Sequence, residues 1–228
     1  MITSPLRLDA VTLETIRANP RVQTFIRKSD QALAMVGYTE HGERHVSLVA
    51  KNARRILHEL GYNEREAELA AIAGYLHDIG NAVNRVMHAQ TGAVIALGIL
   101  SDYGMPDEEI LEVIGAIGNH HEADGCAINA VAAALILADK SDVHRSRVRK
   151  SGQPDFDIHD RVNYAAEQSF LRVNSEVRTI TLELTIDTEI SQVMEYFEIF
   201  LGRMQMCRLA AETLGCRFGL TVNGAQLA

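Results

Sequence analysis

The sequence predicts a mostly α-helical protein, organised as a helical bundle with a small α+β subdomain at its C-terminal end. From Asn19 to about Pro154, apolar residues recur at helical spacing between recognisable helix caps. Further along, "VRTITLELTID" alternates apolar and polar residues strictly, which is typical of a half-buried strand. We therefore expect a helical domain over residues 1–158 and a β-β-α-β subdomain over residues 159–228.

Caps and apolar stripes place the helices of the first domain. Asn19 and Pro20 are a typical N-cap and first helical residue, and Asn63 with Glu66 forms a capping box. The segment "AINAVAAALILA" is apolar on all sides, so its helix should lie in the centre of the core. Helices are expected from Pro20 toward Gly37 and over residues 41–60, 63–77, 89–103, 107–119 and 127–140.

The pattern changes after the polar loop at residues 150–157, which contains Gly and Pro and could be mobile. A short helix over 160–168 should lead into the strand "FLRVN". A turn at Asn174-Ser175 would pair that strand antiparallel with "VRTITLELTID". A long amphipathic helix over 189–214 and a last strand, "CRFGLTV", complete the expected subdomain.

Composition excludes several classes of protein. The chain is 47% hydrophobic and 23% charged, as in globular proteins, and contains no run of 18 apolar residues. Its N-terminus lacks the apolar region of a signal peptide, so a cytoplasmic location is expected. A net charge of −8 disfavours a nucleic-acid duplex as partner. Three cysteines without a CxxC spacing argue against a disulfide framework and a thiolate zinc site, and should be buried or free thiols.

Histidines and aspartates at helix ends form the candidate metal site. Imidazole and carboxylate together suit Mn, Fe, Co, Ni or Zn, and side chains from facing helices can converge in a bundle interior. In "GYLHDIGN", a short carboxylate at a helix end could bridge two cations. A second His-Asp dipeptide, His159-Asp160, shows that the dipeptide alone is not specific. The candidate ligands are His45, His77, Asp78, His88, His120, His121 and Asp139.

This order of residues resembles the HD superfamily of metal-dependent phosphohydrolases, whose minimal signature is H…HD…D. The resemblance implies an HD-type helical bundle. The additional His88 and the His120-His121 pair are similar to the longer set of the dinuclear HD-GYP-like branch, although "HHEADGCAIN" lacks the Gly-Tyr-Pro motif. By resemblance, two divalent transition-metal ions (Fe, Mn, Ni, Co or Zn) would bind. One would be held by His45, His77, Asp78 and Asp139, and the other by His88, His120 and His121 with Asp78 bridging.

The resemblance implies hydrolysis of a phosphomonoester or phosphodiester, in a nucleotide or another small phosphorylated metabolite, by metal-activated hydroxide. The catalytic candidates are Asp78, Glu122 and Lys140. Glu122 could shuttle protons, orient a histidine ligand or be an ordinary solvated side chain. Lys140, Arg145 and Arg147 are candidates for binding the substrate phosphate.

Two other functions use the same residues. The richer histidine set also occurs in di-iron HD-type oxygenases, and a non-catalytic metal- or ligand-binding regulatory module would use the C-terminal subdomain for homodimerisation. His41, at i, i+4 to His45, could add a ligand for a third ion. His58, His144 and His159 fit no ligand position and are expected at the surface. The apolar residues of the last helix should form core or dimer interface: Met194, Phe197, Phe200, Leu201 and Met204.

Overall fold

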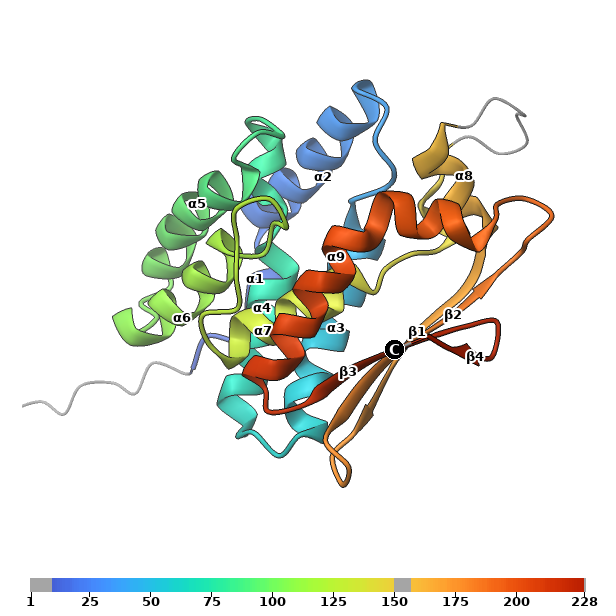
Figure 1. Cartoon of the computed structure of the whole chain (residues 1–228). Coiled ribbons are helices and arrows are strands. Elements are labelled where there is room, and N and C mark those ends of the chain that lie inside the picture. The colour runs from blue at the N-terminus through green and yellow to red at the C-terminus, as the bar shows by residue number, and fades with distance from the viewer. Residues whose placement is uncertain (1–9, 150–156, 228) are drawn as a thin grey trace, which may run out of the picture.

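The structure, a computed structural model, describes residues 10–149 and 157–227, and Figure 1 shows helices packed beside a small sheet. Within these ranges there are nine α-helices, two short 3-10 helices and four strands. The helices are α1 (Leu13–Arg17), α2 (Pro20–Met35), α3 (Glu43–Glu59), α4 (Glu64–Leu76), η1 (Ile79–Ala82), α5 (His88–Asp102), α6 (Asp107–Gly118), α7 (Ala130–Lys140), η2 (Arg145–Arg147), α8 (Ile158–Ala165) and α9 (Val193–Thr213). The strands are β1 (Ala166–Asn174), β2 (Thr179–Ile186), β3 (Arg217–Val222) and β4 (Ala225–Gln226).

The predicted mostly helical fold with a small C-terminal sheet is confirmed. The six helices expected in the first part of the chain are α2 to α7. α7 begins three residues later than expected, because the side chain of Asn129 caps it by accepting a hydrogen bond from the backbone N–H of Ala132. α1 was not predicted.

The core is centred on α7, as its composition predicts. Every residue from Val131 to Ala138 is buried, and α7 packs against α3, α4, α6 and α9. Of the cysteines, Cys126 is exposed, whereas Cys207 and Cys216 are buried free thiols. Among the described residues, no helix combines the length and the apolarity that crossing a membrane requires.

Two glycines allow the close contacts that bring the site residues together. A Cβ on Gly74 of α4 would lie 2.8 Å from the Cα of Ala50 on α3. A Cβ on Gly80 of η1 would lie 2.0 Å from the carbonyl oxygen of His88, at the start of α5. Both distances are shorter than atoms tolerate, so any side chain there would separate helices that carry candidate ligands.

The C-terminal sheet has the order β1-β2-β3-β4. β1 and β2 pair antiparallel, as predicted, whereas β2 and β3 pair parallel. The parallel pairing requires a crossover, which α9 supplies. β4, only two residues long, was not predicted. The helix expected over 160–168 is wrong at its end, because Ala166 already pairs with Ile186 in β1.

α9 joins the sheet to the helical bundle. It contacts α7 as well as β2 and β3, and α8 lies against it (Figure 1). Phe200 and Met204 of α9 are buried in the core, whereas Met194 and Leu201 are exposed. Core residues from both parts of the chain form one hydrophobic cluster. The domain boundary at residue 158 stays a prediction, and residues 150–156 of the expected loop lie outside the described residues.

Candidate metal centre

The candidate ligands lie at or next to the ends of helices. His45 lies in the first turn of α3, and Asp139 lies in the last turn of α7. His77 is the C-cap of α4, and Asp78 is the N-cap of η1. The backbone changes direction between these two neighbours, so both side chains can face one point although they would diverge within a regular helix. His88 begins α5, and His120 follows the end of α6.

A first cluster forms around His45, His77, Asp78 and Asp139. The Nε2 atom of His45 lies 3.2 Å from Nε2 of His77 and 3.4 Å from Oδ1 of Asp139. Oδ2 of Asp78 lies 3.4 Å from Nε2 of His77 and 3.8 Å from Nε2 of His45. Two ligand atoms bound to one ion at about 2.1 Å are roughly 3.0–3.4 Å apart, so this spacing is close to that of a metal site.

A second cluster forms on the other oxygen of the same aspartate. Oδ1 of Asp78 lies 3.5 Å from Nε2 of His88 and 3.9 Å from Nε2 of His120. The two imidazole nitrogens are 3.2 Å apart. Asp78 therefore has one oxygen in each cluster, which is the arrangement of a bridging carboxylate. The Nδ2 group of Asn81 donates a hydrogen bond to Oδ1 of Asp78 and holds this carboxylate in place.

Hydrogen bonds fix the protonation of the four imidazoles. The Nδ1 atom of His77 is bonded to the carbonyl oxygen of Gly74, and those of His88 and His120 are bonded to carbonyl oxygens in the same way. Nδ1 of His45 faces the carboxylate of Asp142. Since these oxygens only accept, each Nδ1 carries a proton and each ring turns its Nε2 toward a cluster.

The spacing and protonation of these side chains indicate whether they could hold metal ions. Within each cluster two Nε2 atoms face each other at 3.2 Å, with a carboxylate oxygen nearby. A cation between the two nitrogens would be bound by both of them and by that oxygen. Burial lowers the pKa of His120 well below its ordinary value and that of His88 to about 4, so these rings are neutral, as metal ligation requires. The described residues fit two cations.

Asp142, which the sequence reasoning missed, supports the first cluster. Its carboxylate is fully buried and accepts hydrogen bonds from His45 and, through both oxygens, from Arg44. Burial alone would raise the pKa of Asp142, but the positive charge of Arg147 and the hydrogen bond to His45 hold it far below the ordinary value. The available signal was an aspartate three residues after Asp139, just beyond the end of the same helix.

Lys140 and Glu122, which were predicted as catalytic, form a chain of ion pairs that begins at Asp139 of the first cluster. The buried Nζ of Lys140 is 2.8 Å from Oδ2 of Asp139 and 2.9 Å from Oε2 of Glu122. Glu122 also pairs with Arg203 of α9. Burial opposes ionisation of Glu122, but the charges of Lys140 and Arg203 outweigh it, so its pKa is well below the ordinary range. The ammonium of Lys140 is thus engaged by two carboxylates.

Two other histidines from the sequence prediction lie beside the clusters without joining them. The ring of His121 packs edge-on against that of His88, but its Nδ1 accepts a hydrogen bond from the backbone N–H of Ala123. Nε2 of His41 accepts a hydrogen bond from Arg147. Neither ring belongs to the groups of donor atoms that converge within 4.8 Å among the described residues.

A cavity of about 310 Å³ lies beside the clusters, and His41, Arg85 and Arg147 line it. Nη1 of Arg85 is 3.3 Å from Nε2 of His88, and no carboxylate of the described residues lies within ion-pair distance of this guanidinium. The sequence analysis did not identify Arg85. It proposed Arg145 as a phosphate-binding residue, but Arg145 pairs with Glu167 at the surface.

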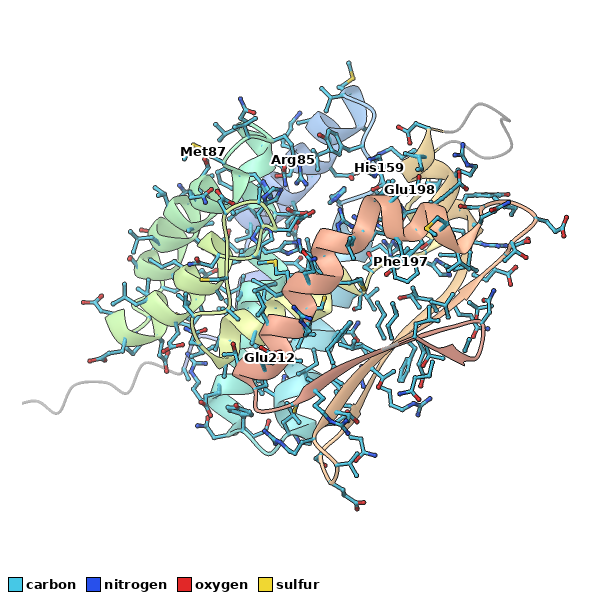
Figure 2. The ribbon with its side chains drawn as sticks, viewed as in Figure 1. Arg85, Met87, His159, Phe197, Glu198 and Glu212 are labelled. Atoms are coloured by element: carbon cyan, nitrogen blue, oxygen red, sulfur yellow. The ribbon has the colours of Figure 1, made fainter. Side chains whose placement is uncertain are left out.

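His159 is exposed, as expected for a surface residue. His159 and Asp160, the second His-Asp dipeptide, line the same cavity from α8. Arg85 and His159, both labelled in Figure 2, line this one cavity. His58 is exposed and pairs with Glu64, as a surface residue would.

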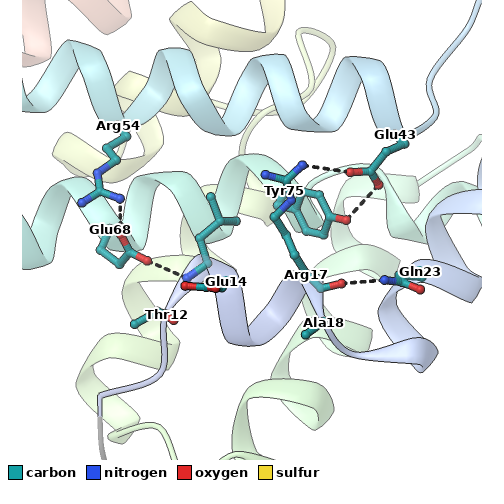
Figure 3. Close-up of a pocket in the computed structure, with 10 residues that line it drawn as sticks. Thr12, Glu14, Arg17, Ala18, Gln23, Glu43, Arg54, Glu68 and Tyr75 are labelled. Carbon is teal, nitrogen blue, oxygen red and sulfur yellow. Dashed lines mark hydrogen bonds and ion pairs between the residues drawn. The ribbon is translucent and has the colours of Figure 1, made fainter.

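A larger hollow of about 1040 Å³ lies elsewhere, between α1, α3 and α4 (Figure 3). Its charged side chains pair with one another: Arg17 with Glu43, and Arg54 with Glu68. The hydroxyl of Tyr75 donates to Glu43 as well. Because none of the candidate ligands lines this hollow, we place the site at the clusters.

The helical fold and the two facing clusters define a metal-binding type of helical domain. Residues 42–144 match the model of the HD domain, a range that includes every residue of both clusters. HD domains bind divalent metals, and the match identifies an HD domain over residues 42–144 of the chain.

The known proteins similar to the chain include one curated relative and one protein of known structure. The uncharacterized protein MJ1020 of Methanocaldococcus jannaschii is 29% identical over 202 residues, covering 78% of this chain and 77% of that protein. The crystal structure of a protein described as a predicted HD superfamily hydrolase, from an uncultured Thermotogales bacterium, is 25% identical with a TM-score of 0.39. That match covers 51% of this chain and 66% of the other.

Proposed function

We propose that this protein is a phosphohydrolase that uses two divalent transition-metal ions to cleave a phosphoester of a nucleotide or another small phosphorylated metabolite. The observation that carries the proposal is the bridging position of Asp78, with one oxygen in each histidine cluster. Ions held there would supply a water of lowered pKa and bind the phosphoryl oxygens of the substrate.

The protein's own residues contribute binding and orientation. Arg85 has no carboxylate partner among the described residues and lies against the second cluster, where a guanidinium can bind phosphate oxygens through two N–H groups. Lys140 and Arg203 keep Glu122 ionised. Glu122 directly follows His121, whose ring packs against His88 of the second cluster. A carboxylate held ionised so firmly is a weak base and does not donate a proton, which favours an orienting role for Glu122 over proton transfer.

The arginine favours phosphoester hydrolysis over the two alternatives. A di-iron oxygenase would use the same imidazole and carboxylate ligands. Those ligands do not by themselves require a neighbouring guanidinium that, like Arg85 among the described residues, has no carboxylate partner. A regulatory module would not require an ionised carboxylate such as Glu122 near the ions. A mixed-valent iron EPR signal accompanied by oxygen consumption would instead support the oxygenase.

Metal content and turnover of an aryl phosphate test the proposal together. Protein purified without chelator should contain a transition metal by mass spectrometry, and added Mn, Fe(II), Co, Ni or Zn should support hydrolysis. Asp78→Ala should lower the metal content and abolish turnover, because it removes a ligand from both clusters. Asp102→Ala, an exposed carboxylate that pairs with Arg21, is the matched control and should change neither. Full activity in metal-free protein, or in Asp78→Ala, would refute the proposal.

A further inference from the structure

A second pocket, which we call the Met87 pocket, adjoins the cavity beside the clusters. Tyr38 and Arg85 line both of them, and the guanidinium of Arg85 lies over the Tyr38 ring at 5.3 Å. The volume of the Met87 pocket, about 400 Å³, is within the range of about 300–1,000 Å³ that small-molecule sites occupy. Because Arg85 also contacts Nε2 of His88, a ligand in this pocket can place an anionic group on Arg85 at the edge of the second cluster.

The apolar side chains of the Met87 pocket are open to solvent, so a ligand can reach them. Val86 is 73% exposed, Met87 is 62% exposed and Tyr38 is 43% exposed. Val36, which is 65% exposed, continues this surface along the neighbouring cavity. Exposed apolar side chains that gather in one place mark a binding surface, whereas singly scattered ones do not.

The polar side chains of the Met87 pocket bond to one another. Nε2 of Gln90 donates a hydrogen bond to Oδ2 of Asp124 at 2.9 Å. Nδ1 of His121 lies 3.5 Å from Oδ1 of the same aspartate and accepts a hydrogen bond from the backbone N–H of Ala123. Among its described residues, the pocket therefore offers a ligand chiefly apolar surface and the guanidinium of Arg85.

Met87 keeps a large apolar side chain where the backbone favours glycine. Arg85 and Met87, both labelled in Figure 2, belong to the loop between η1 and α5. Met87 has φ 59° and ψ 27°, a left-handed conformation that a bulky residue rarely adopts. Such conformations are retained mainly where function requires them. Since the side chain is exposed, packing in the core does not explain its presence.

We infer that the Met87 pocket binds an apolar group of the substrate, a hydrocarbon chain or an unsubstituted ring, while Arg85 and the metal centre bind the phosphate. Charge complementarity sets the orientation, because the anionic phosphate faces the guanidinium and the uncharged end faces Val86 and Met87. The substrate class is then a phosphoester with an apolar group close to its phosphate, rather than a nucleotide. This inference rests on the proposed function and narrows it.

Binding of alkylphosphonates of increasing length to the metal-loaded protein tests the inference. These ligands share one anionic head group, and their phosphorus–carbon bond resists hydrolysis. A fully buried methylene improves binding by about fourfold, so one that is half covered in an open pocket should contribute about twofold. Hexylphosphonate has about five methylenes more than methylphosphonate and should therefore bind about 30-fold more tightly by isothermal titration calorimetry.

Two double variants locate the surface that the alkyl chain contacts. Val86→Ser/Met87→Asn should reduce the preference for hexylphosphonate to about fivefold or less, because it removes apolar side chains of the pocket. Both residues are exposed, so no core contact is lost, and asparagine tolerates the left-handed backbone at position 87. Val94→Ser/Leu97→Asn replaces exposed apolar residues of α5 outside the pocket and should keep the full preference.

Several results would overturn the inference. One is a preference below about tenfold in the wild-type protein, and another is an equal loss in both double variants. Retention of the full preference in Val86→Ser/Met87→Asn would do the same. Tighter binding of the 5′-phosphonate analogue of adenosine than of hexylphosphonate would indicate a nucleotide instead. If chain length has no effect but phosphatidylcholine vesicles bind the wild type and not Val86→Ser/Met87→Asn, the surface contacts a membrane and the inference is wrong.

The two proposals fail separately. A preference for long alkyl chains that depends on Val86 and Met87, without hydrolysis of any phosphoester, would refute the proposed function alone. Hydrolysis of aryl phosphates without that preference would refute only the role of the Met87 pocket.

Discussion

Oδ2 of Asp142 accepts a hydrogen bond from Nδ1 of His45 at 2.6 Å, and both side chains are fully buried. Arg44 holds the carboxylate from the other side with two hydrogen bonds of 3.2 and 2.8 Å. Asp142 therefore keeps a proton of His45 on Nδ1 and directs Nε2 to the first cluster. Such carboxylate–histidine pairs orient metal ligands and increase their basicity.

Replacing Asp142 should weaken metal binding without removing a ligand. We expect Asp142→Asn to reduce metal affinity by about 10- to 100-fold, the usual effect of losing a group that orients a ligand. Competition with a fluorescent chelator measures this affinity. Glu109→Gln breaks a comparable carboxylate–arginine pair, with Arg65, away from the site, and it should leave affinity unchanged. If both variants bind metal as tightly as the wild type, Asp142 only stabilises the fold.

Sequence patterns predicted what depends on neighbours along the chain. The Asn63 capping box is present as expected, and the apolar run of α7 is buried as expected. Both follow from local hydrogen bonding or from side-chain character alone. The parallel pairing of β2 with β3 could not be predicted in this way, because it joins segments separated by the whole of α9.

For the site, the order of histidines and aspartates identified the four imidazoles and two carboxylates that converge. It did not identify Arg85 or Asp142, whose importance depends on which partners they contact in three dimensions. The cavity position of His159 was missed for the same reason. α8 is distant from the ligands in sequence and reaches the cavity only through packing against η2 and α9.

Arg85→Ala should raise KM more than it lowers kcat if the guanidinium binds the ground-state phosphate as strongly as the transition state. Hydrogen bonds to charged groups contribute about 1.5–3 kcal/mol, so KM should rise about 10- to 150-fold. Steady-state kinetics at saturating metal provides the measurement. Arg145→Ala is the control, because Arg145 pairs with Glu167 and does not line the cavity. An equal effect of both variants would argue against a specific role for Arg85.

Acid stability should depend on Glu195 at the start of α9. Hydrogen bonds from Arg161 and Ser191 lower the pKa of Glu195 to about 2, from an ordinary value of 4.5. A carboxylate with a lower pKa in the folded state stabilises the fold above pH 4.5, and this stabilisation disappears as the pH falls from 4.5 toward 2. Glu195→Gln should therefore lower the melting temperature at pH 7 by more than at pH 3.

Thermal melts at several pH values compare Glu195→Gln with Glu212→Gln, an exposed residue near the other end of α9. The difference between wild type and Glu195→Gln should shrink as the pH falls, whereas Glu212→Gln should follow the wild type throughout. A constant difference across the pH range would show that the carboxylate contributes no pH-dependent stability.

Lys140→Met should destabilise the metal-free protein more than the metal-loaded protein. In the metal-free state the buried ammonium offsets the negative charges of Asp139 and Glu122, and removing one partner of a buried pair typically costs about 3–5 kcal/mol. A cation bound to Asp139 would replace part of that offset, so the loss should be smaller when metal is present. Chemical denaturation with and without a chelator measures both values. The double variant Glu122→Gln/Lys140→Met also removes one of the two negative charges that Lys140 offsets and should recover part of the loss. Equal destabilisation in both states would mean that the charge of Lys140 is not coupled to the metal centre.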